Sequence, residues 1–244
     1  MRDLSLGFED YTVQRSINFD VYSGEIFAVL GGSGSGKSTL LKSMLGLIPP
    51  LKGDIIIDGD SIVKARKNDQ NYRKILSKIG VTYQGTAFLG SLSVAENVAL
   101  PFEEHTDLSP ADISTLVCIK LALVNLCGFE YYLPSEISGG MKKRAAIARA
   151  LALDPKILFL DEPSAGLDPV LSTEIDNLLQ TLNKELNISM IIVSHELSSI
   201  FKIADRIVVL DNQGNGVLDQ GPPSKVARES ENEYVHKFLN REKA

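Results

Sequence analysis

The spacing of apolar residues along the chain predicts alternating strands and helices. Three short runs are nearly continuously apolar, as in strands that are buried on both faces of a sheet. They are residues 25–30, 157–160 and 190–193. Residues 37–47 and 169–187 instead carry apolar side chains at helical spacing, and Pro49 and Pro50 end the first of these helices. Because strands and helices alternate, the sequence predicts an α/β fold with a mainly parallel sheet.

Shorter strands are predicted on either side of these elements. They are residues 4–8, 17–21, 54–57, 206–210 and 217–218. The third of them is followed by Asp58 and Gly59, a pair that favours a tight turn. We therefore expect small strands and hairpins at the periphery of the main sheet.

The middle of the chain has few strand signals. Its apolar residues recur at helical spacing over residues 112–126 and 141–153, which predicts a helical lobe inserted into the α/β core. We divide the single domain into a core of residues 1–83 and 156–228, a lobe of residues 84–155 and a polar tail of residues 229–244. The tail has four apolar residues at helical spacing, so we expect a short docked helix there. These are Tyr234, Val235, Phe238 and Leu239.

Composition excludes several classes of protein. The net charge of −6 argues against a nucleic-acid partner, which would favour a basic surface. We expect a soluble chain, because no signal peptide and no run of about 20 apolar residues is visible. Cys118 and Cys127 are too few for a disulfide scaffold or a metal site. We expect both to be small, reduced packing residues of an intracellular protein.

A glycine-rich loop lies between a predicted strand and a predicted helix, where a phosphate-binding loop must lie. It consists of Gly31, Gly32, Ser33, Gly34, Ser35, Gly36, Lys37, Ser38 and Thr39. Glycines let the backbone N–H groups surround phosphates, and the following helix adds its positive N-terminal end. We expect Lys37 to bridge the β- and γ-phosphates of a nucleotide and Ser38 to coordinate Mg²⁺. Many classes of nucleotide hydrolase share this loop.

Two acidic residues follow the apolar run 157–160. In a parallel sheet, a strand delivers such residues to the edge where ligands bind. We expect Asp161 to hold the Mg²⁺ shell and Glu162 to act as the general base that deprotonates the attacking water. His195 follows the run 190–193 at the same edge, where it could contact the γ-phosphate or the water, although a single histidine is often only structural.

A second anion-binding feature is predicted at the start of the helix near residue 141. Ser138, Gly139 and Gly140 would supply a hydroxyl, free N–H groups and a helix dipole. A chain with one phosphate loop has no obvious use for this second site, but two chains arranged head to tail have. Here the sequence resembles the ABC (ATP-binding cassette) ATPases over nearly its whole length.

The resemblance implies a fold and further site residues. The fold is that of a P-loop NTPase of the ABC type, with a mainly parallel core sheet, an antiparallel β subdomain and an inserted helical lobe. Gln84 stands where the family has a glutamine that reaches Mg²⁺ and senses the membrane partner, and residues 165–168 match a loop that crosses the dimer interface. Tyr11 is the aromatic residue expected to stack on adenine.

The resemblance also implies a mechanism and partners. Two copies would sandwich two ATP molecules, each with Mg²⁺, between the phosphate loop of one copy and Ser138–Gly140 of the other. Hydrolysis would open the sandwich, and the lobe would pass the movement to a multi-span permease. The chain would then lie at the cytoplasmic face of the inner membrane. The apolar residues 87–89 could receive a permease helix or pack within the lobe.

Several segments resemble one branch of the family, the Mla-type phospholipid-transport ATPases that work with Mce-domain proteins. They are residues 83–89, 97–106 and 133–141. Met141 replaces the usual glutamine of the family, so an amide contact from that position is lost. The alternatives are an ABC ATPase for another cargo, or a soluble ABC ATPase such as one for iron–sulfur cluster assembly.

Overall fold

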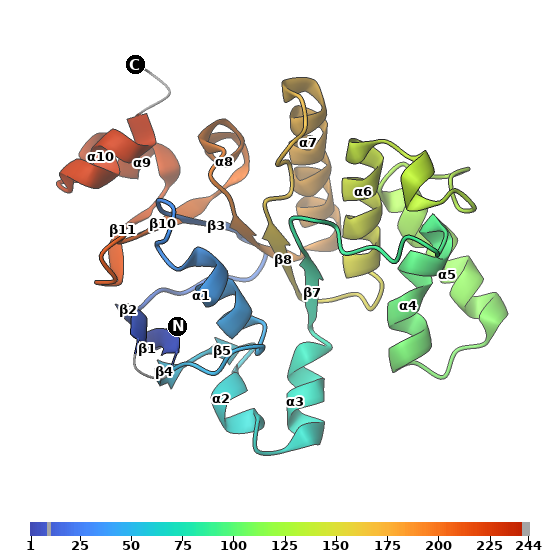
Figure 1. The fold of residues 1–244 in the computed structure, drawn as a ribbon, viewed down its shortest axis with the longest axis horizontal. Helices are drawn as coiled ribbons and strands as arrows, with labels where there is room; N and C mark the ends of the chain where they lie inside the picture. The colour runs from blue at the N-terminus through green and yellow to red at the C-terminus, as the bar shows by residue number, and fades with distance from the viewer. Residues whose placement is uncertain (9–10, 241–244) are drawn as a thin grey trace.

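A six-stranded sheet runs through the centre of the computed structural model, which describes residues 1–8 and 11–240 (Figure 1). Its strands, in spatial order, are β11 (Val217–Gly221), β10 (Arg206–Leu210), β3 (Ile26–Leu30), β9 (Ser189–Val193), β8 (Ile157–Asp161) and β7 (Ile79–Thr82). All neighbouring pairs are parallel except β10 and β11. The predicted mainly parallel sheet is thus confirmed, and the three continuous apolar runs form β3, β8 and β9.

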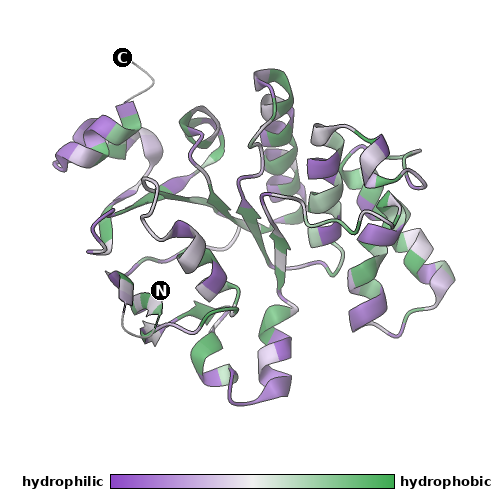
Figure 2. Ribbon diagram, in the orientation of Figure 1, coloured by the Kyte–Doolittle hydropathy of each residue, from purple (hydrophilic) through white to green (hydrophobic). Residues whose placement is uncertain are grey.

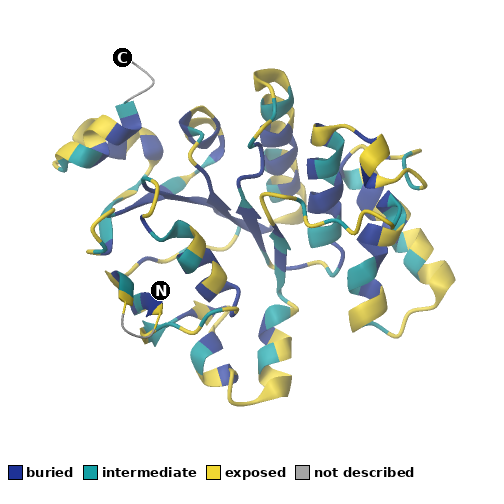
Figure 3. Cartoon of the chain, viewed as in Figure 1, coloured by how far each residue is buried: buried dark blue, intermediate teal, exposed yellow. Residues whose placement is uncertain are grey.

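Helices cover both faces of this sheet. α1 (Lys37–Met44) lies on one face, and α7 (Pro169–Leu186) and α8 (Leu197–Ile203) lie on the other (Figure 1). The side chains of β3 alternate between the two faces: Ile26, Ala28 and Leu30 join one buried cluster, whereas Phe27 and Val29 join the other. The central strands β3 and β9 are accordingly buried along their whole length and are mostly hydrophobic (Figures 2 and 3). Burial on both faces explains why the sequence shows a continuous apolar run there rather than an alternating one.

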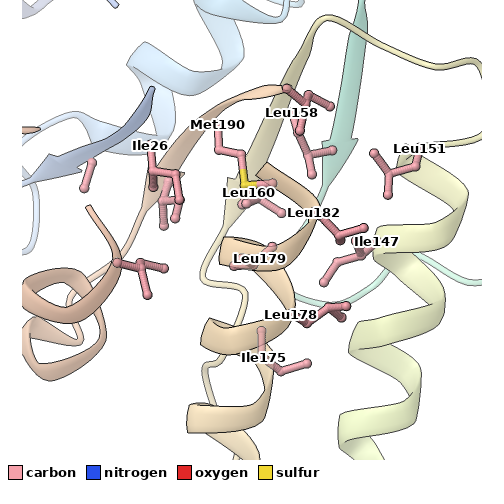
Figure 4. Packing of buried hydrophobic residues seen from close by; sticks show 14 of the residues in the cluster. Ile26, Ile147, Leu151, Leu158, Leu160, Ile175, Leu178, Leu179, Leu182 and Met190 are labelled. Carbon is pink, nitrogen blue, oxygen red and sulfur yellow. The ribbon is translucent and has the colours of Figure 1, made fainter. Parts of the chain in front are cut away.

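One apolar cluster extends from the sheet into the helical lobe. Leu158, Leu160 and Met190 of the sheet pack with residues of α7 and with Ile147 and Leu151 from the end of α6 (Figure 4). The lobe consists of α4 (Val94–His105), α5 (Pro110–Leu123), the 3₁₀ turn η1 (Pro134–Glu136) and α6 (Gly139–Ala150). The C-terminal end of α6 therefore packs against the sheet as part of the shared core.

A smaller antiparallel unit packs against α1. It contains a three-stranded sheet in the order β2-β1-β4 and a two-stranded hairpin of β5 and β6. Their bounds are β1 (Arg2–Phe8), β2 (Tyr11–Ile17), β4 (Lys52–Asp54), β5 (Ile56–Ile57) and β6 (Asp60–Ser61). The hairpin turns at Asp58 and Gly59, which both have positive φ (50° and 82°), as the sequence predicted. This unit is the antiparallel β subdomain.

Several predicted boundaries were wrong. The predicted strand over residues 17–21 ends at Ile17, although Phe19 is still buried and stacks on Phe27 at 5.1 Å between ring centroids. α1 ends at Met44 rather than near residue 47, because Gly46 adopts a left-handed conformation (φ 73°) that closes the helix. The helices α2 (Ile62–Ala65) and α3 (Asp69–Leu76) were not predicted.

The C-terminal helices pack against the core as expected. α9 (Pro223–Glu229) leads to α10 (Glu233–Asn240), whose residues Val235, Phe238 and Leu239 are buried. The predicted docked helix is therefore present. The last four residues of the predicted tail, 241–244, lie outside the described residues.

The expectation that both cysteines are packing residues was wrong. Cys118 and Cys127 are exposed free thiols. Cys118 lies on α5, whose buried residues are its neighbours Val117, Lys120 and Leu121. Since apolar residues occur on all sides of α5, their spacing did not identify which side of the helix faces the core.

Candidate functional site

Four neighbouring strands bring the predicted site residues to one edge of the sheet. The phosphate loop follows β3, His195 follows β9, Glu162 follows β8 and Gln84 follows β7. Because these strands are parallel, their carboxyl ends meet at the same edge, which is where ligands bind in open α/β sheets. The sheet order therefore collects in space what the sequence scatters over more than 150 residues.

The phosphate loop curves between β3 and α1. Gly34 and Gly36 have positive φ (82° and 81°), a conformation that glycine adopts without steric cost. The Lys37 Nζ donates hydrogen bonds to the carbonyl oxygens of Gly31 (2.8 Å) and Gly32 (2.9 Å). Burial lowers the pKa of Lys37, while the carboxylates of Glu162 and Asp161 act in the opposite direction. The ammonium group thus lies across the loop and close to the two carboxylates.

Residues that sequence reasoning missed hold this loop from behind. Gln14 is fully buried, and its Nε2 donates to the carbonyl oxygens of Ser35 (2.9 Å) and Asp211 (2.5 Å). Its Oε1 accepts a hydrogen bond from the Gly216 N–H (2.8 Å). On another side, the Asn212 Oδ1 accepts from the Gly32 N–H (3.1 Å). No motif pointed to these residues, because they come from β2 and from the turn between β10 and β11.

Replacing Gln14 with methionine should destabilise the protein. Methionine has a similar length but leaves the buried groups that Gln14 satisfies without partners, so the free energy of unfolding should fall by about 1–3 kcal/mol. Denaturant titration measures this change. Gln180→Met is the control, because Gln180 makes one hydrogen bond near the surface, to the Lys202 carbonyl. Equal stability of the two variants would contradict the supporting role of Gln14.

The carboxylate pair lies at the end of β8. The Glu162 side chain is buried, with its Oε1 2.6 Å from His195 Nδ1 and its Oε2 accepting from the Ser194 hydroxyl (3.0 Å). Burial raises the pKa of the Asp161 carboxyl, and the neighbouring Glu162 raises it further. The His195 side chain is 61% exposed. Glu162 is therefore oriented from two sides, and Asp161 lies where a cation would be favourable.

The residues present fit a Mg²⁺–nucleotide group. Ser38, Gln84 and Asp161 offer a hydroxyl, an amide oxygen and a carboxylate, and Mg²⁺ prefers such oxygen ligands. The Ser38 and Gln84 residues are exposed, so their side chains are accessible to a ligand. Burial and the neighbouring Glu162 raise the pKa of Asp161, and a bound cation would stabilise its carboxylate. The loop and Lys37 supply the phosphate contacts.

The side chains of Tyr11 and Gln84 are both exposed. Tyr11 begins β2 and is 69% exposed, while Val13 and Gln14 further along this strand contact the phosphate loop. Gln84 is exposed, and its main-chain carbonyl accepts a hydrogen bond from Lys143 (2.9 Å). Tyr11 is thus an exposed residue at the start of the strand that contacts the loop, and the backbone of Gln84 is held by Lys143.

The second predicted anion site forms the start of α6. The Ser138 hydroxyl accepts a hydrogen bond from the Met141 N–H (3.2 Å) and caps the helix. A hollow of about 160 Å³ lies beside it, lined by Ser138, Gly140 and Met141 together with residues of α7 and of the segment 125–129. None of the lining residues belongs to the phosphate loop. Within the described residues, this helix start and the phosphate loop are thus separate surfaces.

This fold and site define a P-loop nucleotide hydrolase with a helical lobe inserted into its core. The family model "ABC transporter" matches residues 14–165, and the chain belongs to this family. It is an ATPase that uses ATP with Mg²⁺.

Relatives of known name cover almost the whole chain. The chain is 36% identical to the "Probable ribonucleotide transport ATP-binding protein mkl" of Mycobacterium leprae, over 98% of its own length and 68% of that protein. It is 36% identical to the "Intermembrane phospholipid transport system ATP-binding protein MlaF" of Haemophilus influenzae, over 99% of its own length and 90% of that protein. It is also 36% identical to the "Methionine import ATP-binding protein MetN" of Staphylococcus saprophyticus, over 95% of its own length and 66% of that protein.

Solved structures share the fold. CbiO1 of Clostridium perfringens, part of the ABC transporter complex CbiONQ, has a TM-score of 0.84 and 32% identity, covering 98% of this chain and 93% of that chain. A dimeric post-hydrolysis state of the ATP-binding cassette MJ0796, bound to ADP and Pi, has a TM-score of 0.79 and 28% identity. The match covers 91% of this chain and 97% of that chain. The predicted fold class is therefore confirmed.

Proposed function

We propose that this chain is the ATPase subunit of a phospholipid transporter of the Mla type. Two copies enclose two ATP molecules and drive a membrane permease. The observation that supports the proposal is that the loop at Lys37 and the capped helix start at Ser138, which both suit a phosphate, are separate surfaces. A head-to-tail dimer uses both, because each copy completes the nucleotide site of the other. The dimeric state of the related cassette MJ0796 supports this arrangement.

The site residues have distinct roles in the proposed mechanism. Lys37 and the N–H groups of the phosphate loop would bind the phosphates, and Ser38, Gln84 and Asp161 would hold the metal. Mg²⁺ supplies electrostatic stabilisation of charge on the phosphates. Glu162 accepts the proton of the water that attacks the γ-phosphate. His195 contacts that carboxylate at 2.6 Å, and its exposed ring would be accessible to the γ-phosphate of a bound nucleotide.

An exposed aromatic and apolar surface beside Gln84 suits a membrane partner. Leu89 is 51% exposed and Tyr131 is 90% exposed. Backbone hydrogen bonds from Val94 to Tyr132 and from Ala95 to Glu130 join the start of α4 to the segment that contains Tyr131. Phe88 instead packs on the core under Arg149, so of the predicted docking residues Ala87 and Leu89 are exposed and Phe88 is not. We infer that a permease helix seats on this surface.

Membrane association would then depend on the permease. Across residues 1–8 and 11–240, every helix is too short or too polar to span a bilayer. We infer a peripheral position at the cytoplasmic face of the inner membrane. The Mla-type assignment adds an Mce-domain protein as a further partner.

The likeness to MlaF supports phospholipid as the cargo, because it extends over nearly the whole of both chains. The likeness to Mkl and MetN points to other cargoes. Gentle purification of the tagged chain from native membranes, with identification of its partners, decides among them. A multi-span permease with an Mce-domain protein supports the phospholipid proposal. A permease of another kind would exclude phospholipid, and soluble partners alone would contradict transport.

Replacing Gly139 with aspartate tests the second half of the nucleotide site. A Cβ at Gly139 would meet only Leu167, at 3.6 Å, and an acidic residue in the first turn of a helix is stabilising by about 0.3–1 kcal/mol. The variant should therefore fold. Its carboxylate should repel the γ-phosphate held by the other copy, so ATPase activity should fall by about two orders of magnitude, the typical effect of losing transition-state charge stabilisation.

The measurement is steady-state ATPase activity alongside equilibrium ATP binding. Binding to the single chain should change less than about twofold, because the phosphate loop is intact. Ser135→Asp is the control, since it adds the same charge nearby in η1. Full activity of Gly139→Asp would contradict the proposed role of the helix start.

A further inference from the structure

Lys143 lies where three segments meet: the start of α6, the loop at Gln84 and the end of β8, which is followed by Glu162. It is five residues after Ser138 and is only 9% exposed. Its Nζ donates to the carbonyl oxygens of Gln84 (2.9 Å) and Glu162 (2.9 Å). One side chain thus connects the helical lobe to the two loops that carry a proposed metal ligand and the proposed general base.

The ammonium group of Lys143 is largely buried and hydrogen-bonded to the main chain. Burial lowers the pKa of its ammonium group, while the nearby carboxylates of Glu162, Asp161 and Glu196 act in the opposite direction. The hydrogen bonds go to main-chain carbonyl oxygens, whose positions follow the backbone. Hydrogen bonds from a charged donor are stronger than neutral ones, so Lys143 holds these carbonyls firmly.

The backbone at Glu162 needs such support. Glu162 has a φ of 51°, which a residue with a side chain rarely adopts. Its N–H donates to the Val193 carbonyl (2.8 Å), and its own carbonyl accepts from Lys143. The two peptide groups that flank the Glu162 Cα are therefore held from opposite sides. Since the backbone sets the direction of the side chain, these bonds fix where the carboxylate points.

We propose that Lys143 is a positioning residue for hydrolysis. It links two events: the start of α6 contacts the nucleotide bound by the other copy, and Glu162 and Gln84 take up their orientation for hydrolysis. The inference rests on the proposed function, because it requires that the α6 start contacts a nucleotide. When α6 shifts, Lys143 carries both carbonyls with it. Hydrolysis is thereby tied to closure of the dimer, while the contacts that bind ATP to the phosphate loop are unaffected.

Substitutions that separate the charge from the length of the side chain test this role. Lys143→Met keeps the length but removes the donor, and Lys143→Arg keeps a charged donor for both carbonyls. We expect kcat to fall by at least about tenfold in Lys143→Met, with the KM for ATP changed by less than about twofold. This pattern is the one expected when an interaction made only in the transition state is removed. Lys143→Arg should recover most of kcat. Lys142→Met is the control, because the side chain of this adjacent lysine makes neither bond.

The outcomes decide the role of Lys143 independently of the proposed function. A Lys143→Met enzyme with kcat within twofold of the native value would overturn the inference, as would a rise in KM that accounts for the whole effect. If Lys143→Met does not fold, Lys143→Gln and Lys143→Arg are compared instead. A lower kcat for glutamine than for arginine supports the role, and equal values overturn it. ATP-dependent dimerisation of Glu162→Gln, measured in parallel, tests the proposed function by itself.

Discussion

Replacing Glu162 with glutamine should reduce ATP hydrolysis to background and leave ATP binding intact. The buried Glu162 carboxylate, held by His195 and Ser194, is the proposed base for the attacking water. Glutamine keeps the shape and can keep both contacts, but it cannot accept the proton. General-base catalysis contributes about 10²–10⁴-fold, so kcat should fall by about that factor.

Phosphate release under saturating ATP measures the loss, and equilibrium binding of labelled ATP measures affinity. Glu185→Gln is the control, because Glu185 is an exposed carboxylate at the C-terminal end of α7, before β9, whereas the site lies after β9. Retention of more than about a tenth of kcat by Glu162→Gln would show that another group takes the proton.

Replacing Lys37 with alanine should abolish tight nucleotide binding. The Lys37 ammonium crosses the phosphate loop, and its burial makes a bound phosphate a favourable partner. A hydrogen bond to a charged group contributes about 1.5–3 kcal/mol, so the Kd for ATP should rise by about 10- to 150-fold. Titration calorimetry with Mg²⁺ and ATP measures this change.

Lys42→Ala is the matched control for Lys37→Ala. Lys42 lies on α1 as well, but it is exposed. Removal of its charge changes the electrostatic field of the helix without touching the loop. An unchanged Kd in Lys37→Ala, with thermal stability equal to that of Lys42→Ala, would refute the assignment of the phosphate loop.

Much of the fold could be predicted because its central strands are buried on both faces. That burial leaves the continuous apolar runs from which β3, β8 and β9 were predicted. The peripheral elements could not be predicted as well. α2 has four residues and α3 eight, too short for a clear helical period, and the exposed thiol of Cys118 lies on α5, a helix that is apolar on all sides.

The candidate site also has a part that could be predicted from the sequence and a part that could not. Its phosphate loop, carboxylates and histidine lie next to strand ends, so local patterns identify them. The supports of the site come from distant segments: Gln14 and Asp211 are 197 positions apart. Lys143 did leave a signal, because it lies four residues before Ile147, on the buried side of α6. A lysine at such a position needs buried acceptors, but the sequence does not say which ones.

The central claim is that two chains build each nucleotide site, and the molar mass of Glu162→Gln in solution tests it most directly. Light scattering with and without Mg²⁺ and ATP should show a monomer that doubles its mass when ATP is added. The double variant Glu162→Gln/Gly139→Asp should bind ATP and remain a monomer. A Glu162→Gln chain that binds ATP as a monomer, or a double variant that dimerises equally well, would contradict the account.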